Sequence, residues 1–142
     1  MSESLVIEAP AKLNLSLRVL RKREDGFHEI DSLMVRLPGL CDRLSFSKAE
    51  ADSFGCDDPG VPADDSNLVL KAVAAYRAAS RFDQPLAIYL EKRVPHGAGL
   101  GGGSSDAAAA FRAMDQLNGD TLGTERLMEL SATIGSDIPF FL

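Results

Sequence analysis

The stretch Pro95-His-Gly-Ala-Gly-Leu-Gly-Gly-Gly-Ser-Ser-Asp-Ala107 decides how this 142-residue chain folds. It places five of the twelve glycines within residues 97–103, directly before an apolar helical pattern at residues 104–117. Glycine lets the backbone adopt positive φ and approach a ligand closely. The first N–H groups of a helix lack partners and lie at the positive end of its dipole. Together these features are typical of a phosphate-binding loop.

The glycines alone leave open which kind of loop this is, and a tight strand-to-helix turn is the simplest alternative. Gly97, Gly99 and Gly102 match the dinucleotide pattern G-x-G-x-x-G, but no strand with a terminal acidic residue follows about 20 residues later. A Walker A loop needs a Lys after its glycines, and none is present here. The glycine loop of protein kinases covers the phosphates from between strands rather than before a helix. A dinucleotide-dependent oxidoreductase is therefore disfavoured.

The composition sets further limits. Hydrophobic residues make up 45% and charged residues 25%, which is ordinary for one globular domain. The net charge of −6 argues against a nucleic-acid or membrane partner, so backbone N–H groups and a few cations must hold any phosphate. Cys41 and Cys56 have no disulfide-framework or zinc spacing. The chain shows no leader and no apolar run of about 20 residues, so we expect a soluble, cytoplasmic protein.

Hydrophobic periodicity predicts the α+β class, with one layer of sheet covered by helices. Residues 12–20 alternate, which places Leu13 and Leu15 on a buried face and Lys12 and Asn14 on a polar face. We expect Asp65 or Ser66 to cap the first helix, and Ser104 or Ser105 to cap the second. The expected strands are 3–9, 12–20, 30–37, 43–47 and 86–90, and the expected helices are 67–80, 104–117 and 124–134. Residues 12–37 are expected to form a long hairpin or meander, and residues 49–66 a loop.

Two further blocks place polar or aromatic residues where chemistry is plausible. Lys12 and Asn14 are two residues apart and share one face of an extended strand. They could hold a substrate hydroxyl and stabilise charge during phosphoryl transfer, although an exposed polar strand face has the same pattern. Phe27 and His28 follow a turn signal, where they could stack on a nucleobase and bond its edge. A packed Phe beside a surface His is the alternative.

Three motifs together resemble the GHMP kinases, the family of galactokinase, homoserine kinase and mevalonate kinase. They are Pro-Ala-Lys-Leu-Asn-Leu at 10–15, Asp-Gly-Phe-His at 25–28 and Gly-Leu-Gly-Gly-Gly-Ser-Ser-Asp at 99–106. Within the family they are most similar to kinases that phosphorylate the 2-hydroxyl of a cytidine diphosphate-linked methylerythritol, in non-mevalonate isoprenoid biosynthesis. The resemblance implies a mixed or antiparallel sheet covered by helices, like domain 2 of ribosomal protein S5. It also implies that residues 1–142 are the N-terminal, ATP-binding domain and that the C-terminal domain is absent from this chain.

The resemblance also implies roles for individual residues. Asp137 would accept the hydroxyl proton and Lys12 would orient the hydroxyl and balance its charge, although the sequence around Asp137 is equally typical of a turn. Phe27 stands where the family often has Tyr, which keeps stacking but loses a phenolic hydrogen bond. Asn14, Phe27 and His28 would bind the cytidine substrate. Ser104 and Ser105 would serve as ligands of the Mg²⁺ that accompanies ATP. ATP itself would contact residues of the glycine loop: Pro95, His96, Gly97, Ala98, Gly99, Leu100, Gly101, Gly102, Gly103, Ser104 and Ser105.

Two alternatives to this function remain open: a GHMP kinase of a small alcohol such as homoserine or mevalonate, and a non-catalytic nucleotide-binding module. The apolar run from Ile138 to Leu142 would need cover if the chain ended there. We therefore expect a missing second half, or a partner such as a second copy, to cover it. With the second domain missing, we expect the chain to fold but to turn over poorly.

Overall fold

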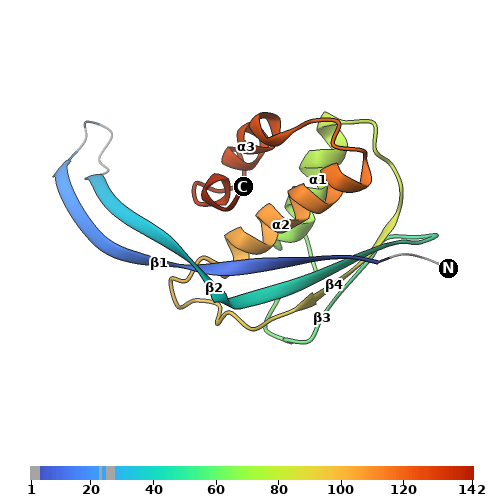
Figure 1. The fold of residues 1–142 in the computed structure, drawn as a ribbon, viewed down its shortest axis with the longest axis horizontal. Coiled ribbons are helices and arrows are strands. Elements are labelled where there is room, and N and C mark those ends of the chain that lie inside the picture. The colour runs from blue at the N-terminus through green and yellow to red at the C-terminus, as the bar shows by residue number, and fades with distance from the viewer. Residues whose placement is uncertain (1–3, 23, 25–27) are drawn as a thin grey trace.

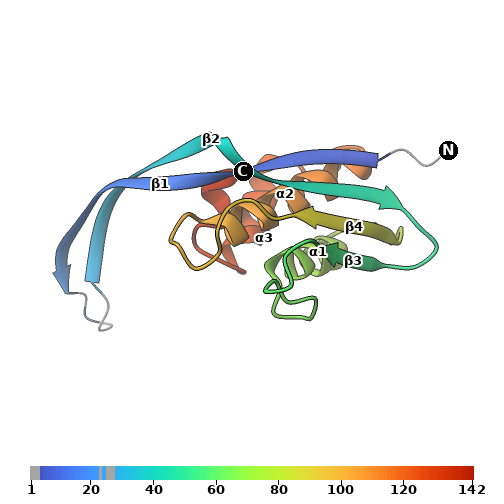
Figure 2. The same ribbon diagram turned by 90° about the horizontal axis from the view of Figure 1, so that it is seen from below.

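The computed structural model describes residues 4–22, 24 and 28–142, with only the backbone of residues 16–20 and 28–32 (Figure 1). A four-stranded sheet has the order β1-β2-β4-β3, in which only the β3–β4 pair is parallel. The helices pack on one face of this sheet, so the expected α+β class is confirmed (Figures 1 and 2). The elements are β1 (Ser4–Lys22), β2 (His28–Lys48), β3 (Ser53–Cys56), α1 (Leu68–Ala79), β4 (Leu86–Glu91), α2 (Gly102–Leu117), α3 (Thr124–Ala132) and the 3-10 helix η1 (Ile138–Phe141).

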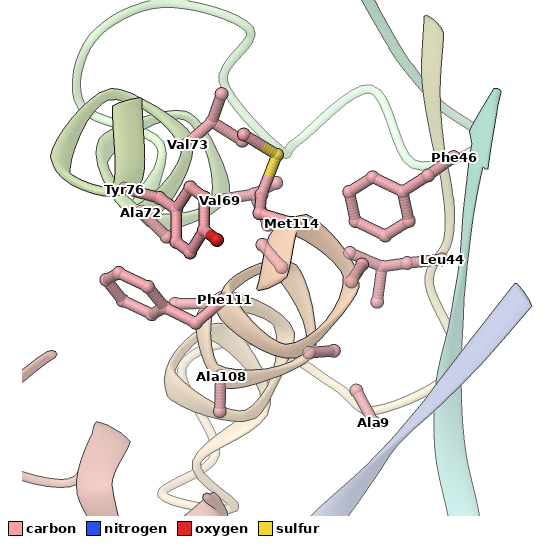
Figure 3. Packing of buried hydrophobic residues seen from close by; sticks show 14 of the residues in the cluster. Ala9, Leu44, Phe46, Val69, Ala72, Val73, Tyr76, Ala108, Phe111 and Met114 are labelled. Carbon is pink, nitrogen blue, oxygen red and sulfur yellow. The ribbon is translucent and has the colours of Figure 1, made fainter. Parts of the chain in front are cut away.

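The core lies between the sheet and the helices, with α2 at its centre (Figure 3). Four consecutive alanines of α2, residues 107–110, are fully buried, and their small side chains let this helix approach its neighbours closely. Leu86, Ile88 and Leu90 of β4 are all buried, as their alternation predicts. Other core side chains are Leu44 and Phe46 from β2, Val69, Ala72 and Tyr76 from α1, and Phe111 and Met114 from α2.

β1 and β2 are longer than predicted and form one antiparallel hairpin (Figure 2). The expected strands 3–9 and 12–20 are a single strand, and so are 30–37 and 43–47. Residues 38–40 of β2 have no partner on β1 and form a bulge, so that the pairing continues across an apparent break in the pattern. The expectation that Leu13 and Leu15 are buried is wrong, since they are 41% and 56% exposed where no helix covers the hairpin.

Several other boundaries differ from the prediction. The expected loop at 49–66 contains β3, which pairs in parallel with β4. Neither Asp65 nor Ser66 caps α1, because the side chain of Asn67 accepts the hydrogen bond from the backbone N–H of Val69. α2 begins two residues earlier than predicted, after Gly101, and has no side-chain cap. Ser104 and Ser105 therefore lie inside the first helical turn, and their predicted capping role is wrong.

The turn between α2 and α3 is closed by one buried carboxylate. Asp115 accepts hydrogen bonds from the hydroxyl of Tyr76 at 2.6 Å and from the backbone N–H groups of Leu122 and Gly123. Burial and the bond to Asp115 raise the pKa of Tyr76 to about 12. This network joins α1, α2 and the start of α3.

The C-terminal apolar run packs onto the chain's own core. Ile138 and Phe141 of η1 are buried, and Phe140 and Leu142 are partly buried against the same cluster. Ile138 and Phe141 are thus covered by the chain itself, whereas cover of the partly exposed Phe140 and Leu142 by a second half or a partner stays a prediction. In the part of the chain that the structure describes, no helix has the length and apolar character required to cross a membrane.

Candidate functional site: the glycine loop and its surroundings

The glycine loop joins β4 to α2 and is held in place by β1. Gly97, Gly99 and Gly101 all have positive φ, as the glycine-rich sequence predicts. The backbone N–H of Lys12 donates to the carbonyl of Leu100 at 2.8 Å. This bond fixes the end of the loop against the edge of the sheet, and the loop then leads directly into the first turn of α2. The free N–H groups of that turn are available to an anion.

Gly101 is the tightest point of the site. Its φ is 69°, and a Cβ atom there would lie 2.8 Å from Cγ of Lys12 and 3.0 Å from Cζ of Phe141. Real Cβ atoms do not come this close to other atoms, so a side chain at this position would displace Lys12 or Phe141. Gly101 therefore brings β1, the loop and η1 together at one place.

A buried cluster of charges lies beneath the loop. Nζ of Lys92 is 2.7 Å from Oδ2 of Asp42 and 3.0 Å from Oδ2 of Asp106. Asp42 also accepts from the backbone N–H groups of Arg93 at 2.6 Å and Val94 at 2.8 Å. All three side chains are at most 5% exposed. Lys92 thus connects β2 to the first turn of α2 through the interior.

The two carboxyl groups of this cluster differ in their affinity for a proton. Burial and the hydrogen bond to Asp42 raise the pKa of Asp106 to about 8. Burial also opposes ionisation of Asp42, but hydrogen bonds from Asp106, Lys92 and two backbone N–H groups hold its pKa below the ordinary value. Near neutral pH, Asp42 is therefore ionised and Asp106 carries the proton.

A cavity of about 170 Å³ opens beside the loop. Asp106 and Lys92 border it, together with Gly103 at the start of α2. Oδ1 of Asp106 is buried and has no hydrogen-bond partner among the described residues. The remaining lining is mostly apolar and comes from the segment before α1, from α1, from β4 and from the loop: Gly60, Val61, Pro62, Ser66, Asn67, Leu68, Val69, Leu90 and His96.

The structure brings some of the predicted site residues together. Lys12 is only 6% exposed, and among the described side chains none forms an ion pair with it. Asp137 is half-buried directly before η1, and within the described residues its carboxylate has no hydrogen bond or ion pair. Phe141, at the other end of η1, lies near Lys12 at Gly101. Lys12 and Asp137 are predicted as a catalytic pair; β1 and η1 meet at Gly101, and the pairing of the two side chains stays a prediction.

The predicted substrate residues lie further along the hairpin. Asn14 is exposed, and its backbone pairs with Met34 on β2. His28 begins β2 opposite Lys22, at the distal end of the hairpin. Phe27 lies outside the described residues. The roles of these three residues stay predictions.

Ser104 and Ser105 were predicted to bind Mg²⁺ together with ATP. Oγ of Ser105 is fully buried and has no hydrogen-bond partner among the described residues, whereas Ser104 is half-buried at the start of the helix. Within the described residues no cluster of three His, Cys, Asp or Glu side chains could hold a metal alone. This donor set fits Mg²⁺ that arrives with phosphates, because Mg²⁺ keeps most of its water and takes few protein ligands.

Comparison with known families decides the classification. A model of the GHMP kinases N terminal domain matches residues 67–142, which is just over half of the chain and includes the loop. The chain belongs to the GHMP kinase family. The resemblance seen in the three sequence motifs is thereby confirmed.

Relatives of this GHMP kinase domain are similar over nearly its whole length. The 4-diphosphocytidyl-2-C-methyl-D-erythritol kinase of Protochlamydia amoebophila is 48% identical over 97% of this chain and 48% of its own length. The enzyme of the same name from Salinibacter ruber is 47% identical, with the same coverage. The chain therefore spans about half the length of these curated relatives.

Solved structures agree with the classification. A crystal structure of 4-(cytidine 5'-diphospho)-2C-methyl-D-erythritol kinase matches with a TM-score of 0.82 and 39% identity, over 96% of this chain and 48% of that chain. Homoserine kinase from Cytophaga hutchinsonii matches with a TM-score of 0.72 and 23% identity, over 99% of this chain and 43% of that chain, and shares the fold.

Sequence reasoning missed the cavity and the buried charge cluster. Asp42 and Lys92 are 50 residues apart, and nothing in the sequence signals that they meet. Asn67 gave a weak signal, since Asn is a preferred helix cap. Val61, Pro62 and Ser66, which lie in the predicted loop at 49–66, form one wall of the cavity.

Proposed function

We infer that this chain is the ATP-binding half of a kinase that transfers the γ-phosphoryl group of ATP to the 2-hydroxyl of 4-diphosphocytidyl-2-C-methyl-D-erythritol. Membership of the GHMP family and relatives 40–48% identical to the chain, all named for this activity, support the proposal. The observation that carries it is Lys12, a cation only 6% exposed that forms no ion pair with a described side chain, beside a phosphate-type loop. A buried unpaired charge costs stability, so its presence indicates an anionic ligand.

The loop and the cavity together suit a nucleoside triphosphate. The N–H groups at the start of α2 would bind the phosphates, which explains how a chain with a net charge of −6 can hold a polyanion. The cavity beside Gly103 would take the adenine between apolar side chains, with Asp106 and Lys92 as the polar groups at its edge. Ser104 and Ser105 would hold Mg²⁺, whose charge neutralises the phosphate oxygens during transfer.

The chemistry requires little covalent work from the protein. The substrate 2-hydroxyl attacks the γ-phosphorus, the bond to the bridging oxygen of ADP breaks, and the hydroxyl proton passes to the carboxylate of Asp137. Lys12 orients the hydroxyl and stabilises the charge that develops on the transferred group. Asn14, Phe27 and His28 would position the cytidine diphosphate portion of the substrate.

A binding test and a turnover test examine this proposal separately. Calorimetry should detect MgATP binding to the chain. A coupled ADP-release assay on the complete polypeptide should detect transfer to the cytidyl substrate but not to homoserine or mevalonate. Protection against thermal unfolding by CDP would further favour the cytidyl substrate. Absence of MgATP binding would refute the proposal, and binding without transfer would instead indicate a nucleotide-binding module.

Two variants separate chemistry from folding. Lys12→Met removes a largely buried charge that no described side chain pairs, so it should leave stability equal or higher while abolishing turnover. Asp137→Asn should reduce kcat by about 10²–10⁴-fold if the carboxylate accepts the proton. A stable Lys12→Met variant with normal turnover would contradict the role assigned to Lys12.

A cytoplasmic location stays a prediction. The bacterial relatives have no location in their names, whereas the plant relatives, such as that of Arabidopsis thaliana, are named chloroplastic.

A further inference from the structure

Two arginines from different elements hold the last carbonyl groups of η1. Nη2 of Arg36, on β2, donates to the carbonyl of Phe140 at 2.7 Å. The guanidinium carbon of Arg36 also lies 5.5 Å from the centroid of the Phe140 ring. Nη1 of Arg112, on α2, donates to the carbonyl of Phe141 at 2.6 Å. These contacts attach η1 to the sheet on one side and to α2 on the other.

Arg36 stands at a particular place in the hairpin. It is the register partner of Lys12 on the neighbouring strand. The side chain of Lys12 and the ring of Phe141 both lie against Gly101. Arg36 therefore links the strand segment that carries Lys12 to the short helix that begins after Asp137.

η1 has little means of keeping its own position. It is one turn of 3-10 helix, a geometry with weak hydrogen bonds. Its final carbonyls have no partners within the turn, and the arginines supply them. Asp137 lies about 8 Å from Phe141 along the axis, from a rise of about 2 Å per residue. Because no described side chain holds the Asp137 carboxylate, its position follows that of η1.

We propose that Arg36 is a positioning residue for phosphoryl transfer: by holding the Phe140 carbonyl it fixes η1, and with it the Asp137 carboxylate, relative to Lys12. This inference rests on the proposed function. Arg36 contacts no reacting atom in this scheme and acts through Asp137. Misplacement of a catalytic group by 1 Å can cost about 10²-fold in rate, so loss of one anchor should be measurable in kcat.

Arg36 is better suited to a test than Arg112. Arg36 is exposed, so its replacement leaves the core intact. Arg36→Met keeps an apolar stem against Phe140 but removes the donors, whereas Arg36→Lys restores a charge and one donor. The matched control is Arg43→Met on the same strand, which breaks only a surface ion pair with Glu8 at 3.8 Å.

Kinetics on the complete polypeptide give the first readout. We expect Arg36→Met to lower kcat by about 10–100-fold, with KM for ATP within about twofold because the loop contacts are unchanged. Arg36→Lys should recover part of the loss, and Arg43→Met should match wild type. Unchanged kcat in Arg36→Met, an equal loss in Arg43→Met, or a change confined to KM for ATP would each overturn the proposal.

Hydrogen exchange gives a readout that does not depend on activity. The amide of Phe140 bonds to the carbonyl of Asp137 and the amide of Leu142 to that of Pro139, and both should exchange at least several-fold faster in Arg36→Met than in Arg43→Met. Equal exchange would overturn the positioning role even if kcat fell. A wild-type polypeptide that transfers no phosphoryl group would refute the proposed function, and the exchange rates would still decide whether Arg36 fixes η1.

Discussion

The β1–β2 hairpin has two halves with different surroundings. In the body half, residues 4–12 pair with residues 36–47, and the side chains facing α2, such as Leu44, are fully buried. In the arm half, residues 13–22 pair with residues 28–35, and the leucines that the structure describes there are 41–57% exposed. Figure 2 shows the arm extending beyond the helices.

The difference shows that alternation and burial are separate properties of a strand. Both halves alternate apolar side chains, with Leu44 and Phe46 in the body half and Leu13 and Leu15 in the arm half. Only the body half has a helix layer above it, and this layer decides whether a leucine is buried. Lys12 and Arg36 pair at the junction of the halves, next to the bulge at 38–40. The candidate site therefore lies where the covered sheet meets the uncovered arm.

The largest expected effect comes from the charge cluster of the body half, which has no counterpart among the described side chains of the arm. Asp42→Asn should reduce the free energy of unfolding by about 3–5 kcal/mol, because it leaves Lys92 without its ionised partner. Urea unfolding at pH 7 measures this loss. The control is Asp52→Asn, which weakens a half-exposed pair with Arg77 and should cost far less. If both variants lost the same free energy of unfolding, burial would not be what makes the Asp42–Lys92 pair important for stability.

The leucines of β2 test the comparison directly. Leu44→Ala should cost about 2–5 kcal/mol, because it opens a cavity between the sheet and α2. Leu33→Ala, on the same strand in the arm, should change stability by less than about 0.5 kcal/mol, since Leu33 is 57% exposed. Thermal or urea unfolding of the two variants measures the difference. A large loss for Leu33→Ala would show that the arm is covered in solution.

The parts of the fold that the sequence predicted are those set by local pattern. The inward side of α2, including Phe111 and Met114, followed from the 3.6-residue period. The glycine loop and the resemblance to GHMP kinases followed from motifs that need particular residue types. The burial of Leu13 was predicted wrongly because a period of two identifies two faces but not which one a helix covers. The cavity and the charge cluster depend on contacts between distant segments, which no local pattern reports.

Gly101 tests the loop at the junction of the two halves. Gly101→Ala should cost about 1–3 kcal/mol, from the strain of positive φ and from displacement of Lys12 or Phe141. Gly119→Ala is the matched control. Gly119 has φ 74° and no atom close to the position of a Cβ, so an alanine there suffers the backbone strain of positive φ but no steric clash. Chemical unfolding of both variants isolates the packing contribution. Calorimetry should also show weaker MgATP binding for Gly101→Ala alone, and equal behaviour of the two variants would mean that the close approach at Gly101 is unimportant.

Asp106 gives the smallest effect near pH 5 and the sharpest test of the buried body half. Its folded pKa of about 8 lies above that of an unfolded chain, so its contribution to stability is complete below about pH 4 and is lost as pH rises to about 8. Asparagine imitates the protonated acid, and Asp106→Asn should therefore differ little from wild type near pH 5. The variant should gain on wild type by up to about 1.4 kcal/mol per pH unit as pH rises towards 8, because it has no proton to lose. Urea unfolding at pH 5, 7 and 9 measures this divergence. If Asp106 were instead ionised and paired with Lys92, Asp106→Asn would be less stable than wild type at pH 7, and the gap would stay constant between pH 6 and 9.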